Sequence, residues 1–430
     1  MELKNIEDLL RFIDESPTCF HAVDKVRNIL EEAGFASNGA GMESSVLKRS
    51  DSEQERMDYV SDKAYIIRND SSLIAYKLPK QAPKGFHIMA SHSDSPCFKI
   101  KTKPEIVVDE QYVKLNVEKY GGMILSTWMD RTLGIAGRVI TKKQDKFVST
   151  LVDLGSDCCV IPNLSVHFNR EINKGFEYNP QVDMIPLFSG DKSSKLMQKI
   201  AKQLSVSDTD ILGSDLYLYS GEKSKRVGMD GEFILAPRLD DLQCAYGTLQ
   251  GFIESEPQEY ISVYCLFNNE EVGSRTRQGA DSDFLEGVLK DIWKETDTFR
   301  NALANSFLIS ADNAHALHPN HPEKSDVTNK PYLNKGIVLK FNGNAQYTTD
   351  GFSQAYMQDL CNQCDASLQT FANRSDVPGG STLGNIVMSH ISVPSADIGL
   401  PQLAMHSAME TAGAYDAEDL IAVSKQFYGM

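Results

Sequence analysis

The sequence predicts an α/β protein, with one domain built on a mostly parallel sheet and a second, mostly β domain inserted into it. After Pro237, apolar strand-like runs alternate with amphipathic helical segments, which is the pattern of a parallel sheet with crossover helices. From about 97 to 236, short strand-like pieces alternate with Gly, Pro and Asn turns, and helical periodicity is sparse. We therefore predict a discontinuous α/β domain over residues 1–96 and 237–430, interrupted by a β-rich domain over residues 97–236.

Composition and charge limit the partners of the chain. It has 430 residues, 41% hydrophobic and 24% charged, which suits a sizeable core divided over roughly two to three domains. The formal net charge is -16. Nucleic acid and anionic membrane surfaces both attract a basic face, so neither is expected as the main partner. No run approaches the ~20 apolar residues of a membrane span.

The first predicted element is a helix at the N-terminus. Apolar residues recur at helical spacing from Leu3 to Ile13, and Pro17 ends the pattern. This segment has no basic leader before an apolar core, so no secretory signal is expected.

The eight cysteines mostly lie in apolar stretches, which favours reduced core thiols over a disulfide framework. We expect a cytoplasmic protein.

The remaining elements follow from periodicity. Residues 64–78 and 86–90 are predicted strands, as are "YVKLNVEKY" and "KFVSTLVDL" in the inserted domain. "LDDLQCAYGTLQGFI" places Leu242, Ala245, Leu249 and Phe252 on one helical face. The apolar strands "YISVYCLF" and "SFLIS" lie on either side of a helix over residues 284–292.

Polar residues follow three of these predicted strands. His92 and Asp94 come after the first, Glu270 and Glu271 after the second, and Asp312 after the third. In open parallel sheets, ligands bind outside the carboxyl ends of the strands. Because side chains alternate along a strand, adjacent glutamates at a strand tip would point in different directions. We therefore expect these groups in one crevice, joined by Asp240 at the start of a helix and by His406.

Two imidazoles and several carboxylates suit Zn²⁺, and the number of candidates fits two metal ions with one bridging ligand. Asp94 is placed to orient the His92 imidazole. One glutamate can bind metal while its neighbour accepts a proton from the attacking water. Each residue also has a structural alternative: Asp240 as a helix N-cap, Asp312 as a turn cap, and His406 as a hydrogen-bonded core histidine.

Two other motifs favour structure over chemistry. "CNQC" (361–364) is an isolated C-x-x-C in a helix-like segment and has no second pair, so it indicates packing. "HALHPNHP" (315–322) is rich in histidine but lies beside prolines, which is equally typical of a structural loop.

The whole pattern resembles the aspartyl aminopeptidase family of dinuclear zinc aminopeptidases. The resemblance covers nearly the whole chain, and many ordered matches make it specific. The motifs that carry it are "SPTCFHAV", "SHSDSP", "YGG" with "TWMDR", "IPNLSVHFNREIN", "RLDDL", "NNEEVGSRTRQGA", "SADNAHALHPN", "SDVPGGSTLG" and "DIGLPQLAMHSAMETAG".

The resemblance implies a role for each matching residue. Asp240 would bridge two zinc ions, for which Co²⁺ or Mn²⁺ can substitute; His92 and Asp312 would complete one shell, and Glu271 with His406 the other. Glu270 would be the general base and acid. The α/β domain would be catalytic. The inserted domain would serve as a dimerisation and lid domain, and dimers would assemble into a tetrahedral dodecamer.

The resemblance also implies how substrate is bound. His167 would reach the active site of a neighbouring subunit and contact substrate or, less directly, metal. Lys340 and Tyr347 would line the substrate pocket, where a lysine explains how an acidic protein accepts an acidic side chain. Asp241, where the family pattern has Asn, and Met409, where many relatives carry Arg, depart from that pattern and bear on substrate preference.

The predicted function is hydrolysis of the N-terminal peptide bond of peptides with a free N-terminus, with a preference for Asp or Glu. One alternative is an aminopeptidase that prefers neutral, Leu-like residues. A second is a dinuclear zinc deacylase acting on N-acyl amino acids. A third is a non-catalytic scaffold with structural zinc, although structural sites are usually rich in cysteine.

Overall fold

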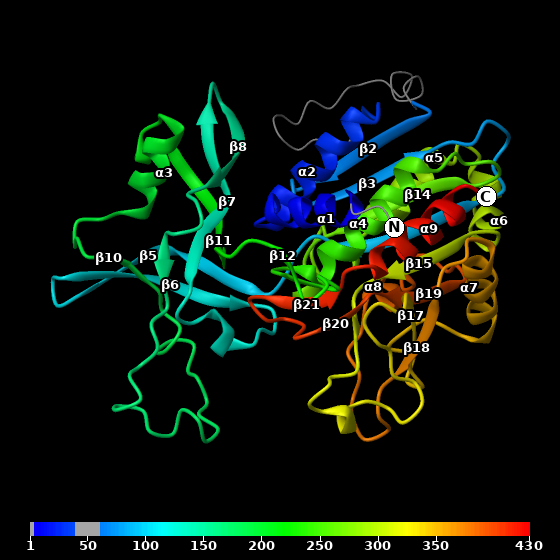
Figure 1. Cartoon of the computed structure of the whole chain (residues 1–430). Helices are drawn as coiled ribbons and strands as arrows, with labels where there is room; N and C mark the ends of the chain where they lie inside the picture. Colours follow the sequence, from blue (N-terminus) through cyan, green and yellow to red (C-terminus); the bar gives the residue numbers. More distant parts are fainter. Residues whose placement is uncertain (1–3, 39–60) are drawn as a thin grey trace.

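A computed structural model of the chain describes residues 4–38 and 61–430, and within these residues it contains three sheets (Figure 1). The nine-stranded sheet forms the α/β unit, the seven-stranded sheet forms the β-rich unit, and the five-stranded sheet lies between them. The predicted fold class is confirmed. No described helix is long and apolar enough to cross a membrane.

The nine-stranded sheet is parallel at its centre. There, β14, β4, β15 and β19 run parallel, with Phe267 beside His92 and Ser310 beside Ala90. Because these strands run in one direction, the residues that follow them meet at one edge of the sheet. In spatial order the strands are β1 (Ala36–Ser37), β2 (Lys63–Arg68), β3 (Ser72–Lys77), β14 (Ile261–Phe267), β4 (Phe86–His92), β15 (Phe307–Ala311), β19 (Ser395–Gly399), β17 (Ile337–Phe341) and β18 (Leu368–Ala372).

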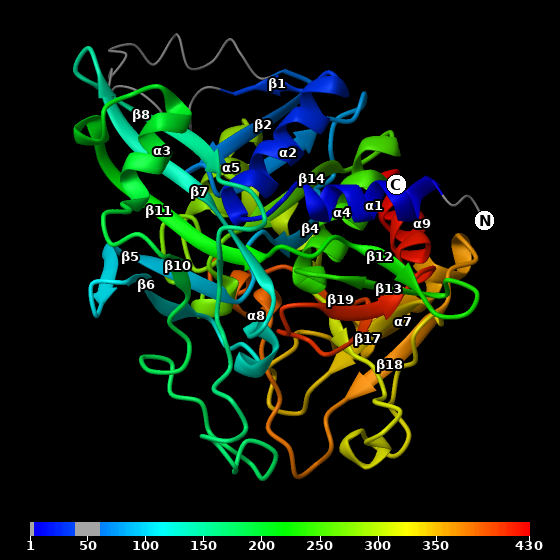
Figure 2. The ribbon, with the colours of Figure 1, turned by 60° about the vertical axis from the view of Figure 1, so that its left-hand side comes forward.

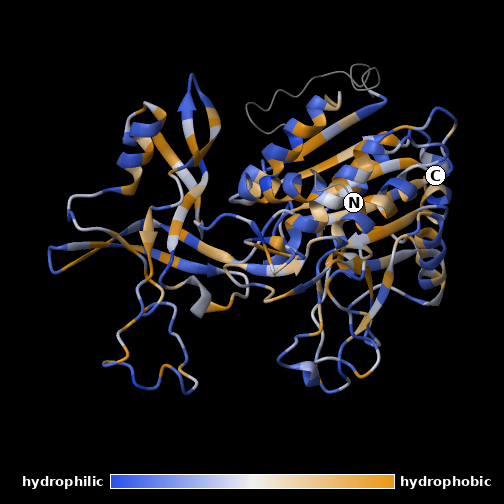
Figure 3. Ribbon diagram, in the orientation of Figure 1, coloured by the Kyte–Doolittle hydropathy of each residue, from blue (hydrophilic) through white to orange (hydrophobic). Residues whose placement is uncertain are grey.

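Helices cover both faces of this sheet, and the strands are accordingly buried on both sides. On β4, Met89 packs into the core on one face while Ile88 and Ala90 pack on the other. The apolar colour in Figure 3 is concentrated in these strands, and the helices have hydrophilic outer sides. The helices are α1 (Lys4–Asp14), α2 (Cys19–Glu32), α4 (Leu239–Glu254), α7 (Gly351–Gln363) and α9 (Asp416–Tyr428) on the first face, α5 (Phe284–Ile292), α6 (Phe299–Ala304) and α8 (Leu383–Val387) on the second, and α3 (Leu196–Leu204) in the β-rich unit.

The β-rich unit is a sheet closed on itself. Strand β11 pairs with β5 at one side and with β7 at the other, which closes the sheet and leaves β8 paired only with β7. Gly137 allows the second pairing, because a Cβ there would collide with the Asp215 carbonyl. Its strands are β5 (Cys97–Val108), β6 (Tyr112–Tyr120), β7 (Thr132–Lys143), β8 (Lys146–Asp153), β9 (Cys159–Val160), β10 (Leu187–Ser189) and β11 (Ile211–Ser220).

The five-stranded sheet joins distant parts of the chain. The segment 225–236 supplies two strands, and the second of them pairs with a strand near the C-terminus. The 97–236 segment therefore contributes to two sheets. The strands in order are β12 (Lys225–Val227), β13 (Phe233–Ala236), β21 (Glu410–Gly413), β20 (Pro401–Leu403) and β16 (Ala314–His315).

All eight cysteines are free thiols, as predicted. Cys361 is buried in α7 and Cys364 follows the end of that helix, so the C-x-x-C motif lies at a helix terminus. His318 and His321 belong to the loop after β16, where their rings lie 5.2 Å apart.

Candidate active site

The site lies at the carboxyl edge of the parallel strands. His92 is the last residue of β4, and Asp312 follows the last residue of β15. Glu270 and Glu271 lie shortly after the end of β14. The strand-end prediction therefore places these residues correctly, and the structure brings them together with Asp240 and His406 in overlapping groups of potential ligand atoms within 4.8 Å of one another.

Asp240 lies between the two histidines. Its Oδ1 is 3.3 Å from His92 Nε2, and its Oδ2 is 3.5 Å from His406 Nε2. Asp312 Oδ1 lies 3.7 Å from the same nitrogen of His92, and Glu271 Oε1 lies 3.3 Å from that of His406. Asp240 does not act as the helix cap considered from the sequence, since α4 has no side-chain cap. The Asp240 carboxylate thus lies between two pairs of potential metal ligands, His92 with Asp312 and His406 with Glu271.

Main-chain carbonyls fix both imidazole rings. His92 Nδ1 lies 3.0 Å from the carbonyl of Asp94, and His406 Nδ1 lies 2.6 Å from the carbonyl of Gly122. A hydrogen bond at Nδ1 leaves Nε2 as the free ligating nitrogen. Both Nε2 atoms face Asp240, so the rings are oriented as metal ligands would be.

The Asp94 carboxylate supports the loop that carries the glutamates. Its oxygens accept hydrogen bonds from the main-chain N–H groups of Glu270 and Glu271, at 3.1 and 3.2 Å, and from the Tyr120 hydroxyl at 2.7 Å. The same carboxylate lies 3.6 Å from His92 Nδ1, farther than the Asp94 carbonyl. Asp94 therefore holds both His92 and the glutamate turn.

The two glutamates lie on a turn, and the expectation that strand alternation separates them is wrong. Strand β14 ends at Phe267, and Asn269 adopts a left-handed conformation with φ of 64° that starts a short 3-10 helix, Glu270–Val272. The Asn269 side chain is held by the Tyr120 hydroxyl at 2.8 Å. The turn brings a ligand oxygen of each glutamate near His92, while only Glu271 also groups with Asp240 and His406.

In this cluster, carboxylates outnumber imidazoles. Burial raises the pKa of Glu270 to about 8 and that of Glu271 well above its ordinary value, and nearby carboxylates add to both shifts. Burial also opposes ionisation of Asp240, yet the neighbouring His406 and His92 side chains hold its pKa below the usual range. One buried oxygen each of Asp240, Asp241 and Glu271 accepts no hydrogen bond within the described chain. Two dications fit such a donor set of imidazole nitrogens and carboxylate oxygens.

Lys340 and Tyr347 lie together beside Asp312. Lys340 is buried on β17, donates to the Asn313 carbonyl at 2.8 Å, and lies 5.4 Å from the centre of the Tyr347 ring. Burial alone would lower the pKa of Lys340, but the charge of Asp312 dominates among the opposing effects and the pKa is raised. A buried lysine whose pKa is raised therefore lies next to the cluster.

The structure does not bring His167 to this cluster. It lies in an exposed turn of the long loop between β9 and β10, which extends away from the α/β unit in Figure 1. Its Nδ1 lies 3.1 Å from Ser165 Oγ. Any contact of His167 with an active site would involve another copy of the chain.

Sequence reasoning missed Glu410. This buried carboxylate accepts hydrogen bonds from the main-chain N–H groups of Asp240 and His406, at 3.1 and 2.6 Å. Asp241, which departs from the family pattern, accepts the main-chain N–H of His92 on its Oδ2 at 3.1 Å. Both residues act on the main chain of the candidate ligands, which ligand spacing alone does not reveal.

Comparison with known proteins agrees with the geometry. The family described as "Aminopeptidase I zinc metalloprotease (M18)" matches residues 12–428. A "Probable M18 family aminopeptidase 2" of Clostridium novyi (strain NT) is 42% identical over 443 residues, covering 100% of this chain and 99% of the relative. The solved structure of the Ape4 and Nbr1 complex matches with a TM-score of 0.90 at 31% identity, over 99% of this chain and 86% of that chain. The S. cerevisiae mApe1 dodecamer matches with a TM-score of 0.84 at 27% identity, over 98% and 96%.

Proposed function

The chain belongs to the M18 family of zinc metallo-aminopeptidases, and we propose that it uses two zinc ions to remove single N-terminal residues from peptides, with a preference for Asp or Glu. The position of Asp240 carries the two-ion proposal, because its two oxygens face two different histidines at 3.3 and 3.5 Å. His92 and Asp312 would complete one shell, and Glu271 with His406 the other.

Zinc held by these residues would supply a Lewis acid for the peptide carbonyl and would lower the pKa of bound water into the neutral range. Glu270 takes the proton from the attacking water and returns it to the leaving amine. Its position on the turn supports this role, because it lies near His92 but outside the group formed by Asp240, Glu271 and His406. Asp94 fixes the turn through main-chain hydrogen bonds and so positions both glutamates.

Lys340 supports the preference for an acidic N-terminal residue. Its ammonium group is buried near Asp312 and lies 5.4 Å from the centre of the Tyr347 ring. Such a group can pair with the side-chain carboxylate of a bound substrate, although the protein as a whole is strongly acidic.

The first experiment compares initial rates on Asp-, Glu- and Leu-terminated chromogenic amides, using zinc-, cobalt- and manganese-loaded protein, beside an N-acetylated amide. We expect the acidic amides to be cleaved fastest and the acetylated amide to be inert. Lys340→Met should lower the rate on Asp far more than the rate on Leu. Fastest cleavage of Leu would assign a neutral preference, cleavage of the acetylated amide would assign a deacylase, and no turnover with metal bound would assign a scaffold.

Self-association is part of the proposal. Apolar side chains are exposed on the β9–β10 loop, including Phe168 beside His167. A relative of similar fold is described as a dodecamer. We infer that the β-rich unit forms dimers that assemble into a tetrahedral dodecamer, with His167 reaching a neighbouring active site to contact substrate or metal. A cytoplasmic location also belongs to the proposal, and cell fractionation tests it.

A further inference from the structure

One segment of the β-rich unit reaches the metal cluster at two places. Segment 120–127 runs from the last residue of β6 into the 3-10 helix Leu125–Trp128, which precedes β7. It supplies none of the candidate metal ligands found among the described residues. It nevertheless contacts both the glutamate turn and the loop that carries His406. The β-rich unit therefore borders the active site through this segment.

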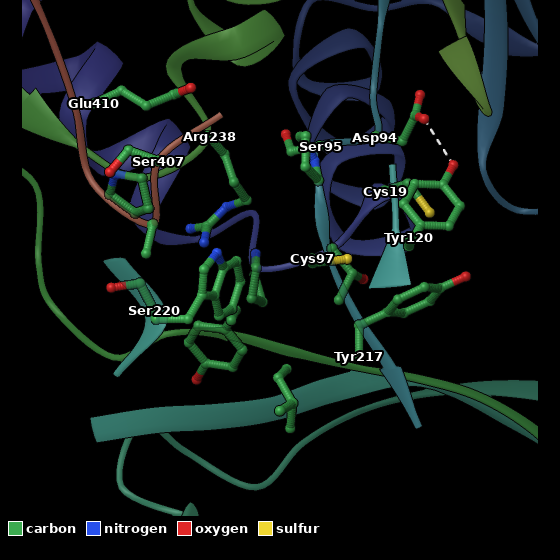
Figure 4. A pocket seen from close by; sticks show the side chains of 18 of the residues that line it. Cys19, Asp94, Ser95, Cys97, Tyr120, Tyr217, Ser220, Arg238, Ser407 and Glu410 are labelled. Carbon is green, nitrogen blue, oxygen red and sulfur yellow. Dashed lines mark hydrogen bonds between the residues drawn. The ribbon is translucent and has the colours of Figure 1, made fainter. Parts of the chain in front are cut away.

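The first contact is made by the hydroxyl of Tyr120. It donates to Asp94 Oδ2 at 2.7 Å and accepts a hydrogen bond from Asn269 Nδ2 at 2.8 Å. Asp94 in turn accepts the main-chain N–H groups of both glutamates, and Asn269 has the left-handed φ of 64° that starts their turn. Figure 4 shows the Tyr120 hydroxyl directed at the Asp94 carboxylate. One hydroxyl thus joins the two side chains that fix the glutamate turn.

The segment also lies directly against Glu271. Gly121 has a left-handed φ of 75°, and a Cβ at this position would come within 3.2 Å of Glu271 Cβ. Glycine adopts this φ readily, and the absence of a side chain lets the segment pack against the turn. The glutamate turn is therefore held by Tyr120 and closely packed by Gly121.

The second contact holds the loop that carries His406. The Gly122 carbonyl lies 2.6 Å from His406 Nδ1, and the Ile124 N–H donates to the His406 carbonyl at 3.0 Å. Thr127 Oγ1 accepts the main-chain N–H of Ala408 at 3.0 Å and donates to the Ile124 carbonyl at 2.7 Å. His406 has a left-handed φ of 67°, which is uncommon for a residue other than glycine and needs support from its surroundings. Segment 120–127 supplies part of that support.

We propose that segment 120–127 positions the two halves of the active site separately: Tyr120 sets the turn that carries the general base, and Thr127 sets the loop that carries one metal ligand. Both act through other residues, so both are positioning residues. Because the roles of Glu270 and His406 belong to the proposed function, the proposal rests on it. The β-rich unit then takes part in catalysis as well as in self-association.

Tyr120→Phe tests the first half, because it removes only the hydroxyl. In zinc-loaded protein it should lower kcat on the Asp-terminated amide by about 10–100-fold, the range typical of groups that orient the residues of a metal site. KM and zinc content should stay nearly unchanged, since the loss falls on the transition state and not on binding. Amide hydrogen exchange over residues 268–274 should become faster, because the turn opens more often.

Tyr217→Phe is the matched control for this variant. The Tyr217 ring packs edge-on against the Tyr120 ring at 5.8 Å, but its hydroxyl forms no hydrogen bond with another described residue. In Figure 4 the Tyr120 hydroxyl meets the Asp94 carboxylate and the Tyr217 hydroxyl does not. Tyr217→Phe should therefore keep the kcat and the hydrogen exchange of the wild type.

Thr127→Val tests the second half, because it keeps the branched shape and removes the hydroxyl that binds the His406 loop. A zinc-binding dye follows the release of zinc from loaded protein in excess chelator. Release of one ion should become about 10–100-fold faster, and release of the other should not change. Thr141→Val, at a buried position of β7, is the control and should release both ions at the rates of the wild type.

The proposal is supported when Tyr120→Phe changes turnover and exchange of the turn, and Thr127→Val changes the release of one ion. It is overturned if both variants behave like their controls. It is also overturned if each variant loses both properties to a similar extent, because the segment would then be a general packing element. Exchange and zinc release need no substrate, so they decide the proposal even if the wild type cleaves none of the amides, a result that would end the proposed function alone.

Discussion

The α/β unit and the β-rich unit leave opposite kinds of group without partners. At the carboxyl edge of the nine-stranded sheet, carboxylates are buried and several of their oxygens accept no hydrogen bond from described residues. In the β-rich unit, more large apolar side chains are exposed than in the α/β unit. They include Val107, Tyr112, Phe147, Leu164, Val166, Phe168, Val182 and Leu212, with Phe168 81% exposed.

The contrast teaches that each unit has a requirement which a single chain does not meet. Buried carboxylates are costly unless positive charge is placed among them. Scattered exposed apolar residues are normal, but several on one loop favour burial against another protein surface. Under the proposed function, metal ions would meet the first requirement and another copy of the chain would meet the second. The four predictions below test this division (Figure 2 shows the two units from a second side).

The largest expected effect is on catalysis at the buried cluster. Glu270→Gln should lower kcat by about 10²–10⁴-fold, because the amide does not transfer protons, while zinc content by elemental analysis stays unchanged. Glu118→Gln, at an exposed position of the β-rich unit, is the control and should keep full activity. A Glu270→Gln enzyme that retains most of its rate would remove Glu270 from the mechanism.

The second effect is on metal binding. His406→Gln should weaken zinc at one of the two positions by more than the ~10–100-fold typical of groups that only support a ligand, so roughly one ion per chain is lost on dialysis. His318→Gln in the loop after β16 should keep both ions. Equal zinc content in the two variants would contradict the assignment of His406 as a ligand.

The third expected effect is on self-association through the β-rich unit. Phe168→Ser should shift the protein to smaller assemblies in analytical ultracentrifugation, because it removes exposed apolar area from the proposed contact. Phe352→Ser alters another exposed phenylalanine, 65% exposed, at the start of α7. The proposed contact at Phe168 is contradicted if both variants keep the mass of the wild-type assembly, or if only Phe352→Ser changes it.

Much of the active site could be predicted because its ligands follow strands with clear apolar patterns. Parallel strands end at one edge, so His92, Glu271 and Asp312 were expected to meet, and they do. Glu410 could not be found in this way, since it acts through the main-chain N–H groups of Asp240 and His406. Its nearest sequence signal is its place four residues after His406.

The fold was predictable to a similar extent and for similar reasons. The β-rich texture of residues 97–236 was visible, but the pairing of β13 with β21 was not, because it joins residues more than a hundred positions apart. The turn at Asn269 was also missed, since a left-handed residue after a strand leaves little trace in apolar periodicity.

The smallest expected effect is on the pH dependence of stability, and it rests on two histidines of strand β4 whose pKa values are shifted in opposite directions. His92, at the end of β4, loses proton affinity through burial but gains more from Asp240 and Asp312, so its pKa is raised. His87, five residues earlier, stacks between Tyr260 and Phe427 at 3.9 and 4.3 Å, and burial lowers its pKa to about 4.

When the pKa of a histidine is lower in the folded state than its unfolded value near 6.5, its protonation favours the unfolded state. Its contribution to stability is therefore fully present above pH 6.5 and is lost as the pH falls toward 4, by about 2–4 kcal/mol. His87→Phe keeps an aromatic ring in the stack and removes the titration. The free energy of unfolding of this variant should fall less steeply than that of the wild type between pH 6.5 and 4. Parallel pH profiles would mean that His87 has the same pKa in the folded and unfolded chain. The contrast between the polar edge of the sheet and its apolar interior would then not hold on this strand.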